Sequence, residues 1–205
     1  MHRIALAVVC LLAWARVLPA QTPEDSRALE RQAECEKARS ILAETRPTRE
    51  QSSWAYGRIV VCGDLAPNAI ASGLLNASAG SPADSFAFNA AWSLSDRRLL
   101  EAVRLLARNT STPAAKRMDA IVLLGRYVSP EQFLRPEGVD DSFGMVVGII
   151  SDGEPFSGTE PITFADRVRA MDTIRRVGVN DPNRRVRRFA KLAAQQLNFS
   201  SGSGP

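Results

Sequence analysis

The chain has 205 residues, of which 45% are hydrophobic and 23% charged, and it carries 26 basic and 22 acidic residues. Its only histidine is His2, so a form without the N-terminus has no Ser-His-Asp or Cys-His pair and no imidazole general base. A zinc site would then depend on cysteine and carboxylate ligands alone.

Residues 1–20 have the pattern of a secretory signal peptide. A positively charged start at Arg3 precedes an apolar run over residues 4–15, and Ala20 precedes a polar residue. The run is too short for a membrane-spanning helix, which needs about 20 apolar residues. We expect cleavage after Ala20, or alternatively after Ala15, and a periplasmic or secreted protein. An uncleaved N-terminal anchor is the other interpretation.

Removal of the signal leaves a chain of about 185 residues, enough for one domain with a continuous core. Arg3 and Arg16 leave with it, so 24 basic residues face 22 acidic ones, and the net charge gives little support for nucleic-acid binding. We expect a helical domain over residues 21–198 and a flexible Ser- and Gly-rich tail over residues 199–205.

The cysteines that remain, Cys35 and Cys62, are predicted to form a disulfide, because an exported chain enters an oxidising compartment. If residues 24–44 and 50–61 form antiparallel helices, the two cysteines lie about 12 and 15 residues from the bend. Since a helix rises about 1.5 Å per residue, they then stand at similar heights. Two separate buried thiols are the alternative.

Five short polar residues followed by proline mark predicted helix starts. A hydroxyl or carboxylate side chain accepts a hydrogen bond from the first turn, and proline at the first helical position loses no hydrogen bond. The pairs are Thr22-Pro23, Ser81-Pro82, Thr112-Pro113, Ser129-Pro130 and Asp181-Pro182. In three of these pairs, an acid or amide stands two residues after the proline, where it completes or approximates a capping box. These residues are Asp25, Asp84 and Gln132.

Apolar residues between these marks recur at helical spacing. The predicted helices span residues 24–44, 50–61, 65–76, 83–94, 96–108, 113–128 and 182–197. Because the joints are short, we predict an all-α fold of stacked antiparallel helical hairpins, with an irregular helical bundle as the alternative. Residues 136–161 interrupt this rhythm. They are glycine-rich, and we expect an inserted acidic loop with some extended structure.

The segment from Asp181 to Ala194 resembles the second helix of a HEAT repeat. The family pattern of Asp-Pro, Val-Arg and spaced alanines before a leucine is matched by Asp181, Pro182, Val186, Arg187, Ala190, Ala193 and Leu197. Residues 113–124 match less fully, through Arg117, Ala120, Leu123 and Leu124. The resemblance implies an α-solenoid of stacked repeats, in which the arginine reaches an acid of a neighbouring repeat.

Charge is segregated around the insertion. Residues 131–160 hold seven acidic residues and one basic residue, whereas residues 161–197 hold nine basic and three acidic ones. One interpretation is that the acidic loop folds back over the basic hairpin or that both faces are solvated. The other is a basic surface for an acidic partner or anionic surface. Its candidate binding residues are Arg184, Arg185, Arg187, Arg188 and Lys191.

Several chemistries receive little support from the sequence. Few aromatic residues accompany the basic cluster, so specific nucleic-acid binding is not expected. The carboxylates of the insertion are Asp140, Asp141, Asp152 and Glu154, and their spacing matches no EF-hand loop. The sequence also contains no glycine-rich phosphate-binding motif. We therefore expect an exported, non-enzymatic scaffold without cofactor or metal, which binds a protein partner in the cell envelope. The alternatives are a carboxylate- or metal-dependent enzyme that uses the insertion, and a purely structural envelope component.

Overall fold

The computed structural model describes residues 23–44, 47–129 and 159–201. These residues form eight α-helices and one short 3-10 helix, and none of them lies in a β-strand. The predicted all-α fold is thereby confirmed. The signal-like segment 1–20, the greater part of the insertion and the predicted helix starts at Thr22 and Pro130 lie outside the described residues.

The observed helices match the predicted ones closely. In chain order they are α2 (Pro23–Ala43), α3 (Arg49–Ile59), α4 (Leu65–Asn76), α5 (Pro82–Leu94), η1 (Arg97–Leu99), α6 (Leu100–Arg108), α7 (Ala114–Val128), α8 (Phe164–Asn180) and α9 (Arg184–Ser201). The predicted helix over 65–76 has the same first and last residues as α4, and the predicted helix over 96–108 begins with the 3-10 turn η1. The sequence analysis did not predict limits for α8, which lies within the basic residues 161–197.

The chain divides into two compact units between Ala33 and Glu34, inside α2. In the first unit the described residues, 23–33, are helical and exposed except for the half-buried Ser26. All other described elements belong to the second unit.

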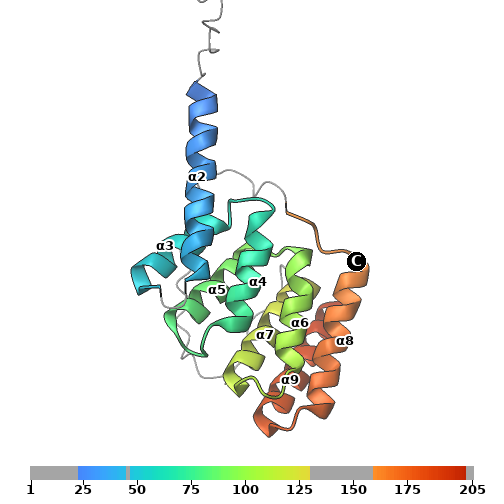
Figure 1. Ribbon diagram of the computed structural model, residues 1–205. Coiled ribbons are helices and arrows are strands. Elements are labelled where there is room, and N and C mark those ends of the chain that lie inside the picture. Colours follow the sequence, from blue (N-terminus) through green and yellow to red (C-terminus); the bar gives the residue numbers. More distant parts are fainter. Residues whose placement is uncertain (1–22, 45–46, 130–158, 202–205) are drawn as a thin grey trace, which may run out of the picture. The chain divides into compact units, whose positions relative to one another are not determined.

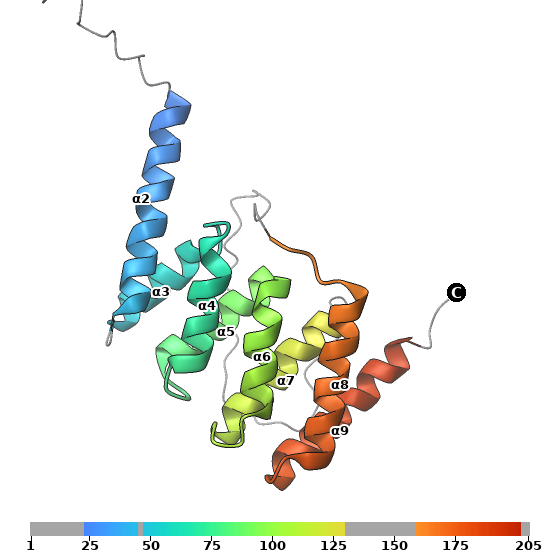
Figure 2. The same cartoon turned by 45° about the vertical axis from the view of Figure 1, so that its right-hand side comes forward.

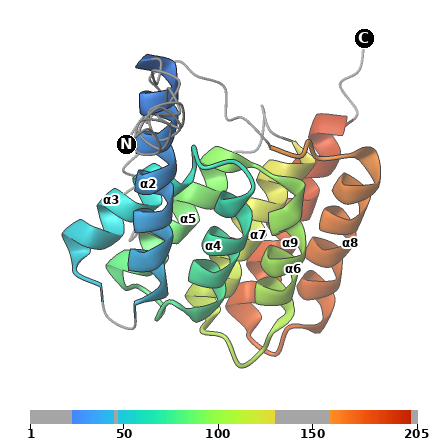
Figure 3. The same ribbon diagram turned by 45° about the horizontal axis from the view of Figure 1, so that its top comes forward.

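The second unit consists of helical hairpins stacked in two layers (Figures 1, 2 and 3). Helices α4, α6 and α8 lie side by side in one layer, and α3, α5, α7 and α9 form the other. The pairs α4–α5, α6–α7 and α8–α9 pack as hairpins. Stacking buries the apolar face of each hairpin, which an isolated hairpin would expose to water. The predicted stacked-hairpin architecture is confirmed.

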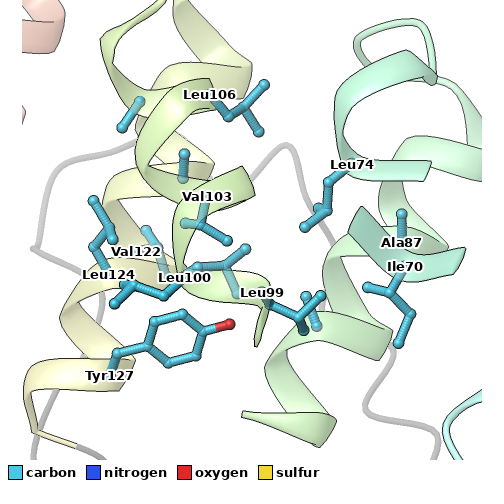
Figure 4. Close-up of a cluster of buried hydrophobic side chains, with 14 of the residues drawn as sticks. Ile70, Leu74, Ala87, Leu99, Leu100, Val103, Leu106, Val122, Leu124 and Tyr127 are labelled. Carbon is cyan, nitrogen blue, oxygen red and sulfur yellow. The ribbon is translucent and has the colours of Figure 1, made fainter. Parts of the chain in front are cut away.

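The hydrophobic core lies between the two layers. Figure 4 shows Tyr127 of α7 beside Leu100 of α6, with its hydroxyl group toward Leu99 of η1, and Leu74 of α4 facing Val103. Tyr127 is fully buried, and its hydroxyl group has no hydrogen-bond partner among the described residues. Burial, together with the negative charge of Asp96, raises the pKa of Tyr127, so the phenol stays neutral.

Close contact between α3 and α4 depends on a glycine. A Cβ atom at Gly73 would overlap the hydroxyl group of Tyr56, so position 73 accommodates no side chain. Tyr56 is itself only 5% exposed. Its burial, together with the nearby negative charge of Asp84, raises the pKa of Tyr56 to about 12. The small residue thus lets a large aromatic side chain pack between the helices.

The predicted helix start at Ser81-Pro82 is confirmed. Pro82 is the first residue of α5, and the hydroxyl oxygen of Ser81 accepts a hydrogen bond from the backbone N–H of Asp84 at 3.2 Å. The Asp84 carboxylate accepts in turn from the N–H of Gly80 at 3.0 Å. Ser81 thus satisfies one free N–H group of the first helical turn, and Asp84 satisfies an N–H group just before the helix.

The capping roles predicted for two other pairs are wrong, although their helices begin within two residues of the predicted positions. Pro113 is the N-cap residue of α7 rather than its first residue, and no side chain caps that helix. Asp181 is the C-cap of α8, and α9 begins at Arg184, where the Asn183 side chain accepts from the N–H of Arg185 at 2.9 Å. Asp181 does not cap α9 because its carboxylate binds Arg117 of α7.

Two complete capping boxes begin with threonines that no proline follows. Thr48 and Gln51 exchange hydrogen bonds at the start of α3, and Thr163 and Asp166 do so at the start of α8. Their Thr-x-x-Gln and Thr-x-x-Asp spacings are visible in the sequence, so these helix starts were predictable.

The predicted disulfide between Cys35 and Cys62 is confirmed, with the two Cα atoms 5.6 Å apart. It ties α2 to the turn that follows α3. An ion pair between Glu34 and Arg58 at 3.2 Å and a contact of the Lys37 ammonium with the Trp54 ring at 5.0 Å join the same two helices.

We expect the double variant Cys35→Ser/Cys62→Ser to lose about 2–4 kcal/mol of unfolding free energy, because the unfolded chain gains the freedom that the crosslink removed. Urea unfolding followed by circular dichroism measures the loss. A reducing agent should lower the midpoint of the wild type and leave that of the variant unchanged. Equal midpoints for oxidised wild type and variant would contradict the prediction.

Candidate functional site

The C-terminal hairpin α8–α9 presents a strongly basic surface. Its exposed basic side chains are Arg167, Arg169, Arg175, Arg176, Arg184, Arg185, Arg188 and Lys191. The three acidic residues of the hairpin pair with only two of them. Asp166 lies 3.7 Å from Arg169, and the half-buried Asp172 lies 2.9 Å from Arg176, whereas Asp181 pairs with Arg117 of α7.

Three of the predicted binding residues lie on one stripe of α9. Arg184, Arg188 and Lys191 follow an i, i+4, i+7 spacing, so they share one side of the helix. They are exposed, and none forms an ion pair within the described part of the chain. We call these three residues the α9 stripe. Arg185 is also exposed and equally unpaired among the described residues, but it lies to one side of the stripe.

Arg187, the fifth predicted binding residue, has a different role. It is half-buried, and its Nη1 atom donates to the carbonyl oxygen of Asp181 at 2.6 Å and to that of Pro182 at 3.0 Å. These bonds satisfy carbonyl groups in the turn between α8 and α9. Arg187 therefore stabilises the turn, whereas the HEAT resemblance implied that it reaches an acid of a neighbouring hairpin.

A buried ion pair positions the basic hairpin on its neighbour. Arg117 of α7 donates from Nε and Nη2 to the two carboxylate oxygens of Asp181, each at 2.9 Å. The two side chains are 4% and 2% exposed. Asp181 also accepts from the N–H of Asn183 at 2.8 Å, and Arg117 donates to the carbonyl oxygens of Thr110 and Thr112. The start of α9 is thus fixed against α7 through a bidentate pair.

A second buried carboxylate holds the chain that leads into α8. Asp96 is fully buried and accepts from the Arg98 side chain at 2.7 and 3.0 Å and from the N–H of Glu160 at 2.9 Å. The N–H of Arg97 donates to the carbonyl oxygen of Glu160 at 3.0 Å. Residue 160 is therefore attached to the start of η1.

Opposing effects act on the pKa of Asp96. Burial raises it, but hydrogen bonds from the Arg98 side chain and from the Glu160 backbone more than offset burial, so the pKa lies below its usual value. The charged carboxylate thus contributes stability above its unfolded-state pKa, and that stability is lost as the pH falls through the lower folded-state value.

The last acidic residue of the acidic stretch does not neutralise α9. The Glu160 carboxylate lies 3.6 Å from Nε of Arg97 and 3.8 Å from Nε of Arg98, on the η1 side. The other acids of that stretch, including Asp140, Asp141, Asp152 and Glu154, lie outside the described residues. Among the described residues, Glu160 is the only acid of that stretch, and it forms no ion pair with α8 or α9. No described contact therefore supports the interpretation in which the acidic loop folds over the basic hairpin.

A small cavity of about 10 Å³ lies between the α4–α5 and α6–α7 hairpins and is lined in part by Asp84, Lys116 and Asp119. Lys116 and Asp84 form a buried ion pair with Nζ and Oδ1 3.0 Å apart. A cavity of this size accommodates about one water molecule. No group of three metal-ligating side chains occurs within residues 23–44, 47–129 and 159–201.

No protein-family model, curated protein or solved structure matches this chain. Among the described helices, none combines the length and the apolar character needed to cross a membrane.

Sequence reasoning missed one feature of the hairpin. Three apolar side chains of α8 are largely exposed: Phe164 by 82%, Val168 by 52% and Val179 by 70%. Their 4- and 11-residue separations are helical, so the spacing was available in the sequence. Their spacing alone does not show that no other described helix covers them, since this depends on tertiary packing.

Proposed function

We propose that this protein is an exported, non-enzymatic interaction scaffold of HEAT-like hairpins that binds an acidic protein of the cell envelope through α9. The observation that carries the proposal is the exposed group Arg184, Arg185, Arg188 and Lys191, which has no acidic partner among the described residues. Like charges held close together on one helix repel one another, and an acidic partner relieves this repulsion and associates faster.

The buried contacts around the hairpin support this function. Arg117 and Asp181 fix the start of α9, and the Asp96 carboxylate fixes the chain before α8. The basic side chains therefore project from helices that are held rigidly, which lowers the entropic cost of binding a partner. The bidentate contact between adjacent hairpins also supports a repeat-like stack of the HEAT type.

Export is supported by the signal-like N-terminus and by the disulfide, since disulfides persist in oxidising compartments. Amino-terminal sequencing of protein recovered from the cell envelope or medium tests this part of the proposal. We expect a first residue of Gln21, or of Arg16 if cleavage follows Ala15. An intact Met1 in that material would contradict signal cleavage.

The distribution of lysines provides a direct test of the binding surface. The sequence has three lysines: Lys37 on α2, the buried Lys116, and Lys191 on the α9 stripe. The protein is incubated with an envelope extract of its source organism, treated with an amine-reactive crosslinker, and analysed by mass spectrometry. We expect partner peptides to be linked mainly at Lys191, with exposed Lys37 as the internal control.

Charge reversal gives the matching loss of function. Because crosslinking needs Lys191, the variant Arg184→Glu/Arg185→Glu/Arg188→Glu keeps it, and we expect its Lys191 crosslinks to fall at least tenfold. The control Arg27→Glu/Arg39→Glu/Arg49→Glu changes the same net charge on α2 and α3 and should retain them. Equal crosslinking in both variants, or links mainly at Lys37, would contradict a binding surface on α9.

A further inference from the structure

The exposed apolar residues of α8 form a second side of that helix, which no other described helix covers. With 3.6 residues per turn, Phe164, Val168 and Val179 fall within about 60° of one another around the helix axis. The core-facing residues, among them Ala170 and Val177, lie on a different side. We call Phe164, Val168 and Val179 the α8 stripe.

The α8 stripe adjoins the α9 stripe along the contact between the two helices. Arg175, on the same side of α8, donates from Nη2 to the Oδ1 atom of Asn198 at 3.1 Å. Cγ of Lys191 lies 3.2 Å from the position that a Cβ at Gly178 would occupy. Both contacts place α9 next to the uncovered side of α8, and this hairpin is the last one in the stack (Figures 1 and 2).

We propose that the α8 and α9 stripes together dock one amphipathic, acidic helical segment of the partner protein. This inference rests on the proposed function and specifies the chemistry of the partner. Apolar side chains at helical spacing would cover the α8 stripe, and carboxylates flanking them would pair with Arg175, Arg188 and Lys191. Charge complementarity selects this occupant, because the acids of the hairpin are buried or already paired.

The arrangement of the stripe favours a protein helix over a lipid surface. Arg175 lies between Val168 and Val179 along the exposed side of α8. If this side entered a bilayer, the Arg175 guanidinium would be drawn toward the apolar boundary, which is costly. An acidic helix instead places a carboxylate opposite Arg175 while its apolar residues contact the valines.

Two synthetic peptides of equal composition test the proposal. In the amphipathic peptide, leucines recur at positions i, i+4, i+7 and i+11 among glutamates and alanines; in the scrambled peptide, the leucines surround the helix. Both are labelled with fluorescein and titrated with the full chain, and fluorescence anisotropy gives their affinities. We expect the amphipathic peptide to bind at least tenfold more tightly than the scrambled one.

Variants separate the apolar contribution from the charge. Phe164→Ser/Val168→Ser/Val179→Ser removes the apolar surface without changing charge, and it should lower the affinity for the amphipathic peptide about tenfold while leaving the scrambled peptide unaffected. The matched control changes exposed apolar residues of other elements, Val61→Ser/Leu75→Ser/Leu105→Ser, and should bind as the wild type does. Circular dichroism verifies that each variant is folded.

Other outcomes would overturn the inference, each in its own way. Equal binding of both peptides, or no binding of either, would refute the amphipathic docking site. The proposed function is tested separately by the Lys191 crosslinks to envelope partners. Binding to anionic phosphatidylglycerol vesicles that the three serine substitutions abolish, without peptide discrimination, would assign the face to lipid. A homodimer that these substitutions dissociate would assign it to a second copy. A zero-length carboxyl-to-amine crosslink from Lys191 to residues 131–158 would show that the chain's own acidic segment occupies it.

Discussion

The variant Arg117→Met is expected to lose about 3–5 kcal/mol of unfolding free energy, because it leaves the Asp181 carboxylate buried without its counter-charge. Asp181 is 5% exposed and would keep the N–H of Asn183 as a hydrogen-bond donor. Methionine fills much of the space of the arginine stem, so the loss reports the uncompensated charge together with the hydrogen bonds that Arg117 donates to the Thr110 and Thr112 carbonyl groups. Urea unfolding followed by circular dichroism measures the effect.

The matched control for this prediction is Arg176→Met. Arg176 pairs with Asp172 at the same 2.9 Å, but the two side chains are 65% and 48% exposed. An exposed pair contributes at most about 1 kcal/mol, so the control should unfold near the wild-type midpoint. The double variant Arg117→Met/Asp181→Leu should recover part of the loss, since neither charge then remains buried, whereas the N–H of Asn183 still lacks its acceptor. Equal destabilisation by the two single variants would refute the assigned role of burial.

The sequence was sufficient to predict most helix limits because local chemistry determines them. Ser81-Pro82 starts α5 as expected, since the hydroxyl group, the proline and Asp84 act within one turn. The disulfide was predictable because two cysteines at similar helical heights would meet in an oxidising compartment. These features depend on residues close in sequence or on a single covalent pairing.

Asp181-Pro182 shows where local reasoning fails. It has the same pattern as Ser81-Pro82, yet α9 begins at Arg184 with Asn183 as the capping side chain. The Asp181 carboxylate is bound by Arg117, which lies 64 residues earlier in the chain. A pattern of neighbouring residues contains no information about such a distant partner, so the cap was assigned to the wrong residue.

The candidate site was predictable in composition but only partly in geometry. The basic character of residues 161–197 is evident from the sequence, and four of the five predicted binding residues are exposed. Both sides of α8, however, have apolar residues at helical spacing. Ala170 and Val177 are buried by other helices, whereas Phe164 and Val168 are exposed. Periodicity identifies both stripes, and only tertiary packing decides which one is covered.

The second large effect is expected at the buried pair of Lys116 and Asp84. Their side chains are 5% and 6% exposed, and the Lys116 ammonium also donates to the carbonyl oxygen of Ala77. We expect Lys116→Met to lower the unfolding free energy by about 3–5 kcal/mol, since the Asp84 carboxylate would stay buried without a cation. The carbonyl group of Ala77 would lose its donor as well. Thermal and urea unfolding measure the loss.

Two further variants separate charge from the capping role of Asp84. Asp84→Asn in the Lys116→Met background removes the unpaired charge but retains a side-chain oxygen that accepts from the N–H of Gly80, so stability should partly recover. Lys37→Met removes an exposed lysine beside Trp54, a contact that contributes about 0.5–1 kcal/mol. If Asp84→Asn instead adds to the loss from Lys116→Met, the dominant cost is a missing hydrogen bond at the start of α5 rather than a buried charge.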